Sequence, residues 1–234
     1  TDESHTGEWI KELVKVWIEK IGFERFCAAC SDSTGNTLLA RHLLVEIYPN
    51  IFSLADICHH LDNTNKDLVK ISFFDKTIKV IRGTISSFTK SHAGKSALQK
   101  AREELRIGAG LQAIGKTRFV TIILSALSVQ RNIPAIKRAL ENSSFDFEYA
   151  DYFPSNMDSK SKLKGRKFED SLQQLIDIGL PIAKALTCME SNDANPADVF
   201  LFWHAVVFGI ERIITDEDNG YPTDVQEQIL AVLN

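Results

Sequence analysis

The sequence predicts a mainly α-helical chain of the α+β class, in which a short strand–helix–strand segment is followed by a larger all-helical region. Apolar residues recur at helical spacing through most of the 234 residues. Near the N-terminus, two short apolar runs at 26–31 and 51–55 are bounded by turn-forming residues, which is typical of strands. The composition, 44% hydrophobic and 25% charged, is that of a globular chain with a sizeable core.

The first region is predicted to span residues 1–60. Its first helix follows from a broad apolar stripe that includes Trp9, Val14 and Ile18. Ser, Thr, Gly and Asn then interrupt the apolar pattern after the first strand, which predicts a turn that leads into the next helix. The predicted elements, in order, are helix 7–21, strand 26–31, helix 37–48 and strand 51–55.

The second region, residues 61–234, is predicted to be helical throughout. Pro134 is expected to open a short helix at its first turn, where the missing N–H has no cost. Residues 142–165 have no clear period and are expected to form a polar linker, and the aromatic residues at 200–208 are expected in the core. The helices are predicted at 74–88, 93–105, 117–129, from 134, 167–189, 195–215 and 224–233.

Charge is distributed unevenly along the chain, whose net charge is −4. The segment 61–140 contains fifteen Lys or Arg and five Asp or Glu, so it carries +10, whereas the remainder carries −14. A basic surface of this kind suits a polyanion, because neutralising phosphates releases counterions. The alternative is that the basic segment pairs with the acidic remainder of the same chain. The apolar runs at 119–129 and 199–210 are shorter than the roughly 20 residues of a membrane span, so no membrane partner is expected.

Asp32 is the first candidate site residue, because it follows a predicted buried strand at the end where sites of α/β proteins lie. The alternative is that Asp32 or Ser33 caps the following helix by accepting a backbone N–H. Cys27 and Cys30 form a C-x-x-C pair, but residues three apart on a strand point to opposite faces, so buried thiols in a reducing, intracellular setting are expected.

Residues 110–117 match the phosphate-binding pattern G-x-x-x-x-G-K-T. This motif requires a buried strand immediately before its first glycine. A charged, helical run precedes Gly110 instead, so the context disfavours nucleotide hydrolysis.

Three stretches, in the same order and at the same spacing, resemble hAT-superfamily DNA transposases, especially the fungal type. The similarity extends from about Thr6 to the end of the chain. The stretches are Ser-Asp-Ser-Thr-Gly-Asn-Thr at 31–37, Asp-Ile-Cys-His-His-Leu-Asp-Asn-Thr at 56–64 and Ile-Gly-Lys-Thr-Arg-Phe at 114–119.

The resemblance implies that residues 1–60 are part of a ribonuclease-H-like fold and that residues 61–234 are a helical insertion domain. Asp32 matches the second acid of a three-carboxylate site, which would hold Mg²⁺ or Mn²⁺ if the protein is catalytic. The first and last acids are expected to lie outside this chain. His59 is a further candidate metal ligand, with a structural Asp56–His59 pair as the alternative.

In such transposases the Thr-Arg-Phe stretch handles the DNA end. Arg118 would bind phosphate and Phe119 would support an unstacked base, unless Phe119 is buried in its helix. The other candidate DNA-binding residues are Lys95, Lys100, Arg102 and Lys116.

The expected function is therefore that of a transposase-derived, nuclear DNA-binding protein that is catalytically incomplete by itself. One alternative is a non-enzymatic structural or interaction protein on the same fold. A weaker alternative is a metal-dependent nuclease that uses Asp32. Association with a second copy of the chain is left open.

Overall fold

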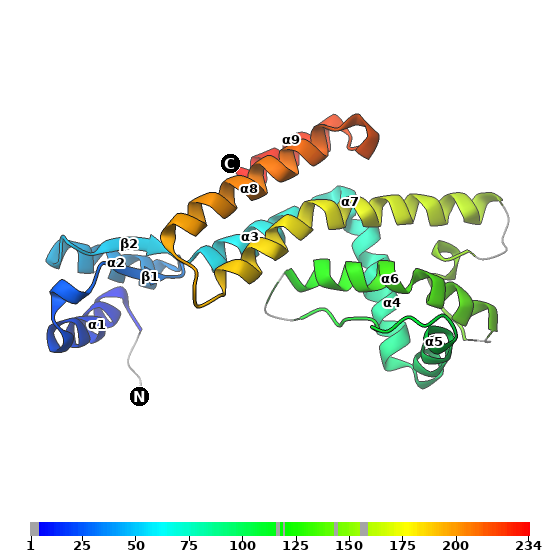
Figure 1. The fold of residues 1–234 in the computed structure, drawn as a ribbon, viewed down its shortest axis with the longest axis horizontal. Coiled ribbons are helices and arrows are strands. Elements are labelled where there is room, and N and C mark those ends of the chain that lie inside the picture. Colours follow the sequence, from blue (N-terminus) through cyan, green and yellow to red (C-terminus); the bar gives the residue numbers. More distant parts are fainter. Residues whose placement is uncertain (1–4, 116–117, 119, 143–144, 155–158) are drawn as a thin grey trace. The chain divides into compact units, whose positions relative to one another are not determined.

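The computed structural model describes residues 5–115, 118, 120–142, 145–154 and 159–234, and its elements are shown in Figure 1. Most of the described residues are helical, which confirms the predicted mainly α class. The chain divides into two compact units, unit 1 (Thr1–Leu61) and unit 2 (Asp62–Asn234). The described helices include none that is long and apolar enough to cross a membrane.

Unit 1 is built from two helices and a two-stranded parallel sheet. The strands pair in register from Ala28 opposite Phe52 to Ser31 opposite Ala55. The elements are α1 (Gly7–Ile21), the 3₁₀ turn η1 (Phe23–Arg25), β1 (Ala28–Ser31), α2 (Gly35–Ile47) and β2 (Phe52–Ala55); α3 (Ile57–Leu68) begins in unit 1 and ends in unit 2.

Local sequence signals explain where α1 begins and ends. The Thr6 hydroxyl accepts a hydrogen bond from the Trp9 backbone N–H at 3.2 Å and so caps the first turn. Gly22, with φ of 103°, ends the helix in a conformation that other residues rarely adopt. Ile18 of α1 then packs with Leu44 and Ile51 in a small buried cluster, so this unit has a core of limited size.

The described part of unit 2 consists of helices and their connecting segments, without strands. Its long helices pack in sequence, with α6 against α5 and α7, and α7 against α8. The elements are η2 (Ser72–Phe74), α4 (Asp75–Lys90), α5 (His92–Glu104), α6 (Val120–Asn142), η3 (Ala150–Tyr152), α7 (Ser159–Met189), α8 (Pro196–Thr215), η4 (Glu217–Asn219) and α9 (Thr223–Leu233).

Close backbone approach and aromatic packing stabilise this unit. A Cβ atom added at Gly179 of α7 would lie 2.3 Å from Ile123 Cδ1 of α6, so the two helices meet directly at the glycine. The Phe88 ring packs on the rings of Phe145 and Phe147, with centroids 5.2 Å away in each case. These contacts bring the segment after α6 back onto α4.

Two predicted boundaries in unit 2 are wrong. Pro134 lies inside the 23-residue helix α6 and does not open a new helix. Ile133 and Ala135 on either side are buried, and this continuous buried stripe outweighs the loss of one backbone hydrogen bond. Helix α7 begins at Ser159, so the end of the predicted linker is helical; Gly165 is buried there and packs against Pro154.

The expectation of buried thiols is also wrong for the C-x-x-C pair. Cys27 and Cys30 are both exposed, because the two-stranded sheet of unit 1 leaves much of its surface open to solvent.

Candidate nucleic-acid interface

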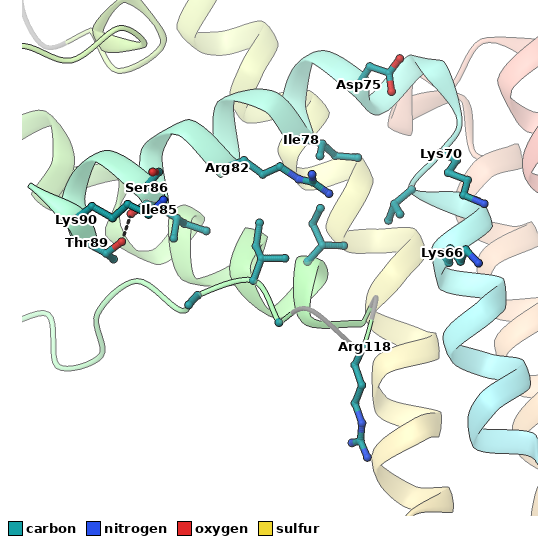
Figure 2. A pocket seen from close by; sticks show the side chains of 15 residues that line it. Lys66, Lys70, Asp75, Ile78, Arg82, Ile85, Ser86, Thr89, Lys90 and Arg118 are labelled. Atoms are coloured by element: carbon teal, nitrogen blue, oxygen red, sulfur yellow. Dashed lines mark hydrogen bonds between the residues drawn. The ribbon is translucent and has the colours of Figure 1, made fainter. Parts of the chain in front are cut away.

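A basic cleft with a volume of about 680 Å³ lies within unit 2 (Figure 2). Its walls come from α3, from α4, from residues 113–115 and from the start of α6. One acidic residue, Asp75, lines it together with five basic residues: Lys66, Lys70, Arg82, Lys90 and Arg118. We call this surface the basic cleft.

The amphipathic pattern of α4 places cations along one wall of the cleft. Its apolar stripe, which includes Ile81 and Phe88, is buried in the core of unit 2. Arg82, Ser86 and Lys90 follow each other at intervals of four residues, which sets them on one face of the helix. Arg82 and Lys90 therefore extend from the same helix along the cleft (Figure 2).

Part of the lining of the cleft is apolar. Val69, Ile78, Ile85 and Ile122 contribute to its lining. Apolar walls of low dielectric concentrate the field of the surrounding cations, which raises the local attraction for an anion.

Two of the five cations already have carboxylate partners. Lys70 Nζ lies 3.0 Å from Asp67 Oδ1, and Arg118 Nη1 lies 2.6 Å from Glu190 Oε1. The described residues provide no ion pair for Arg82 or Lys90. These two side chains are exposed and therefore available to an external anion.

Ion pairs also involve two basic residues of segment 61–140 outside the basic cleft. Lys137 pairs with Glu169 at 2.8 Å, and Arg138 pairs with Glu104 and Glu141. Some of the positive charge of this segment is therefore neutralised within the chain, while the described residues provide no ion pair for Arg82 and Lys90 of the cleft.

The structure separates the predicted DNA-binding residues. Arg118 lines the basic cleft, whereas Lys95, Lys100 and Arg102 lie on α5 and do not. Lys100 lines another cavity of about 360 Å³, where Arg138 is also found. The Arg102 guanidinium donates to the Gly108 carbonyl. Lys116 and Phe119 lie outside the described residues.

Sequence reasoning counted Lys66, Arg82 and Lys90 in the basic segment but did not select them. The signal was the spacing of Arg82 and Lys90, which lie eight residues apart, with Ser86 midway between them, beside a buried stripe. That spacing shows that they share a face. It does not show that residues 113–115, 118 and 122, more than 20 positions later, line the same cleft.

Asp32 follows β1 directly, and hydroxyl groups surround its carboxylate. The Thr37 and Thr34 hydroxyls donate to Oδ1 at 2.6 and 3.2 Å. The pKa of Asp32 lies below its ordinary value, mainly because of the hydrogen bond from Thr37. Desolvation opposes this shift. The hydroxyl and backbone N–H of Thr34 and the charge of His59 lower the pKa further. Asp32 therefore orders the turn before α2, while the N-cap position itself is Thr34.

No metal centre is formed by the described residues around Asp32. Among them there is no group of three or more His, Cys, Asp or Glu side chains that could hold a metal ion. His59 acts on Asp32 through its charge. Asp56 Oδ1 accepts from the Cys58 backbone N–H at 2.9 Å and so stabilises the first turn of α3.

The G-x-x-x-x-G-K-T stretch has the context that the sequence predicts. Gly110 follows helix α5 and a short irregular segment, so the described residues immediately before it form no strand. The Gly115 backbone N–H donates to Thr121 Oγ1 at 2.9 Å, so in this structure it is already engaged within the chain. A nucleotide-binding role for this loop is not supported.

Comparison of the chain with protein-family models, with curated proteins and with solved structures finds no match. The basic cleft is therefore interpreted from its own geometry and charge.

Proposed function

We propose that unit 2 binds the phosphate backbone of a nucleic acid, DNA in particular, in the basic cleft. The observation that carries this proposal is the set of five cations around one cleft with a single acid, Asp75. Arg82 and Lys90 have no ion-pair partner among the described residues, so phosphates would replace water and counterions there. A guanidinium and an ammonium both suit phosphate oxygens.

The sequence resemblance to hAT transposases supports DNA as the polyanion and a nuclear location. In this proposal residues 1–60 derive from a ribonuclease-H-like domain and residues 61–234 from the helical insertion domain. Asp32 would be one acid of a catalytic site whose other acids another segment supplies. Cleavage or strand transfer would then require Mg²⁺ or Mn²⁺ bound jointly by those carboxylates.

A specific observation favours a second candidate function, that of an interaction protein. The side chains of Phe200, His204 and Phe208 lie one turn apart along α8, with ring centroids 4.3 and 5.9 Å apart in successive pairs. Phe200 and Phe208 are exposed, so the prediction that they belong to the core is wrong. Exposed aromatic rings on one helix face are typical of a protein-binding surface.

The test of DNA binding is a titration of a fluorescently labelled duplex at several salt concentrations. We expect the logarithm of the binding constant to fall linearly with the logarithm of the salt concentration. The cleft variant Arg82→Glu/Lys90→Glu should weaken binding about tenfold or more, because two cations become anions next to the phosphates.

The matched control is Lys95→Glu/Lys100→Glu, which changes the net charge by the same amount on α5. It should retain binding within about threefold of wild type. A greater loss in the α5 variant than in the cleft variant would move the site to α5, as the sequence predicted. No binding at low salt would contradict the proposal and leave the interaction protein as the better candidate.

A further inference from the structure

Arg41 is a buried cation in unit 1. This residue is 5% exposed and lies in the middle of α2, between the buried residues Ala40 and Leu44. One guanidinium nitrogen, Nη1, donates to the Leu54 carbonyl, and the buried Nε has no hydrogen-bond partner. An arginine does not lose its proton in a protein, so this charge and its unused donor must be compensated in another way.

The described part of unit 1 provides no carboxylate in contact with this guanidinium. Asp56 uses Oδ1 to cap α3. Cys30 does not provide an anion either. Although this residue is exposed, partial desolvation of its thiol, with a smaller contribution from Asp56, raises the pKa, and Arg41 only partly opposes this. Burying a charge without a partner is strongly unfavourable, so the arrangement favours an external counter-anion.

Arg41 also lines a cavity of about 210 Å³ between α1, β1 and α2. The walls are mainly apolar and include Val14, Ile18 and Leu44. Ser31 and Thr37 supply hydroxyl groups, but both are hydrogen-bonded to Asp32. The volume is below the roughly 300–1,000 Å³ of sites for drug-sized ligands, so the space suits a small molecule with an apolar body.

We propose that this cavity binds a small monocarboxylic acid, whose carboxylate pairs with Arg41 and whose apolar body contacts α1 and α2. A carboxylate matches the planar donor fork of a guanidinium and accepts two parallel hydrogen bonds. A phosphate is more strongly hydrated and gains nothing from apolar walls, so it fits less well. This site is separate from the basic cleft, and it does not depend on DNA binding.

Benzoate is a suitable probe, because it combines a carboxylate with a compact apolar ring. NMR can follow the Arg41 Nε–H signal directly, and Arg41→Lys identifies that signal by removing it. We expect benzoate to shift the signal in a saturable manner. Benzamide, which has the same shape without the charge, and inorganic phosphate should not produce a saturable shift.

Two variants separate binding from folding. Arg41→Met keeps a long apolar side chain and removes the buried charge, so without ligand it should melt at the wild-type temperature or above. Its benzoate affinity should fall about 30-fold or more, as expected when a buried charge pair loses one partner. Arg25→Met removes an exposed arginine of the same unit and should bind benzoate like wild type.

The outcomes are distinct. Saturable binding by wild type and Arg25→Met, and its loss in Arg41→Met, would support the proposal. Equal affinity of Arg41→Met and wild type, or no saturable shift of the Arg41 signal with benzoate, would overturn it. A shift by phosphate equal to that by benzoate would also overturn it, because it would show an anion site without preference for a carboxylate.

Discussion

Unit 1 and unit 2 distribute charge and apolar surface in opposite ways. In unit 1 the guanidinium of Arg41 is buried, while the ring of Phe52 on β2 is 71% exposed. In unit 2 the ring of Phe88 is 1% exposed, while Arg82 and Lys90 of the same helix lie at the surface. Unit 2 thus follows the usual pattern of globular domains, and unit 1 departs from it.

This difference in burial follows from the number of elements that pack against one another in each unit. The two-stranded sheet of unit 1 has few neighbours, and its buried cluster centres on Ile18, Leu44 and Ile51. The helices that are described after α3, from α4 to α9, give unit 2 several packed interfaces. An anion would therefore bind inside unit 1, against Arg41, but on the surface of unit 2, along the basic cleft.

The largest predicted effect comes from replacing one phenylalanine by alanine in each unit and comparing the two losses of stability. Phe88→Ala removes a ring that packs on Phe145 and Phe147, and should lower the free energy of unfolding of unit 2 by about 3–5 kcal/mol. Phe52→Ala removes an exposed ring, and should change the free energy of unfolding of unit 1 by less than about 1 kcal/mol. Amide hydrogen exchange measures the two units separately.

If Phe52→Ala lowered the free energy of unfolding of unit 1 by several kcal/mol, the ring of Phe52 would have to be packed in solution. That result would contradict the predicted contrast between the two units. Phe88→Leu is the control, since it keeps most of the buried volume and should cost about 1 kcal/mol.

Helical spacing and capping residues predicted the elements well where local signals dominate. Helix α1 begins and ends at the predicted residues because Thr6 caps it and Gly22 ends it. Helix α6 was predicted with a break at Pro134, because the local cost of proline is visible in the sequence. The burial of Ile133 and Ala135 on both sides of it, which decides the outcome, depends on α5 and α7 and is not visible.

The candidate site was predicted less completely, for a similar reason. Sequence reasoning selected Arg118 through the resemblance of residues 114–119 to hAT transposases, and it located the basic segment from residue types alone. It could not assign Lys100 and Lys90 to different cavities, since that assignment depends on how α4 and α5 pack. The unused Nε donor of Arg41 could not be predicted from the sequence either, because no residue spacing indicates that an arginine is buried.

A smaller effect is predicted at the Arg118–Glu190 ion pair, whose two side chains are both exposed. Figure 2 shows Arg118 extending away from Arg82, which is where Glu190 holds it. Glu190→Gln should release Arg118 toward the basic cleft and remove a negative charge. Exposed pairs contribute about 0.2–1 kcal/mol, so duplex affinity should rise about two- to fivefold.

The same salt titration measures this effect. Glu169→Gln is the control, because it removes the partner of Lys137 with the same change of charge and outside the cleft. It should raise affinity less than Glu190→Gln does. Equal gains would attribute the effect to net charge alone.

The smallest predicted effect concerns Asp32 in unit 1 and depends on pH. The folded-state pKa of this carboxyl is lowered, first by the Thr37 hydroxyl. The charged form therefore stabilises the fold at pH values above about 4, the unfolded pKa, and this contribution is lost as the pH falls through the lower folded-state pKa. Asp32→Asn should reduce the free energy of unfolding by less than about 1 kcal/mol at pH 6, because the carboxylate is partly solvated.

The difference between wild type and Asp32→Asn should shrink as the pH falls from 6 to 2. Urea unfolding followed by exchange of the unit 1 amides measures it. Thr37→Val removes the main donor, so the carboxyl pKa should return toward its ordinary value and the pH dependence should weaken even though Asp32 is present. A pH dependence unchanged in Thr37→Val would contradict Thr37 as the main cause and would assign the lowered pKa to Thr34 of the same turn or to His59 of α3.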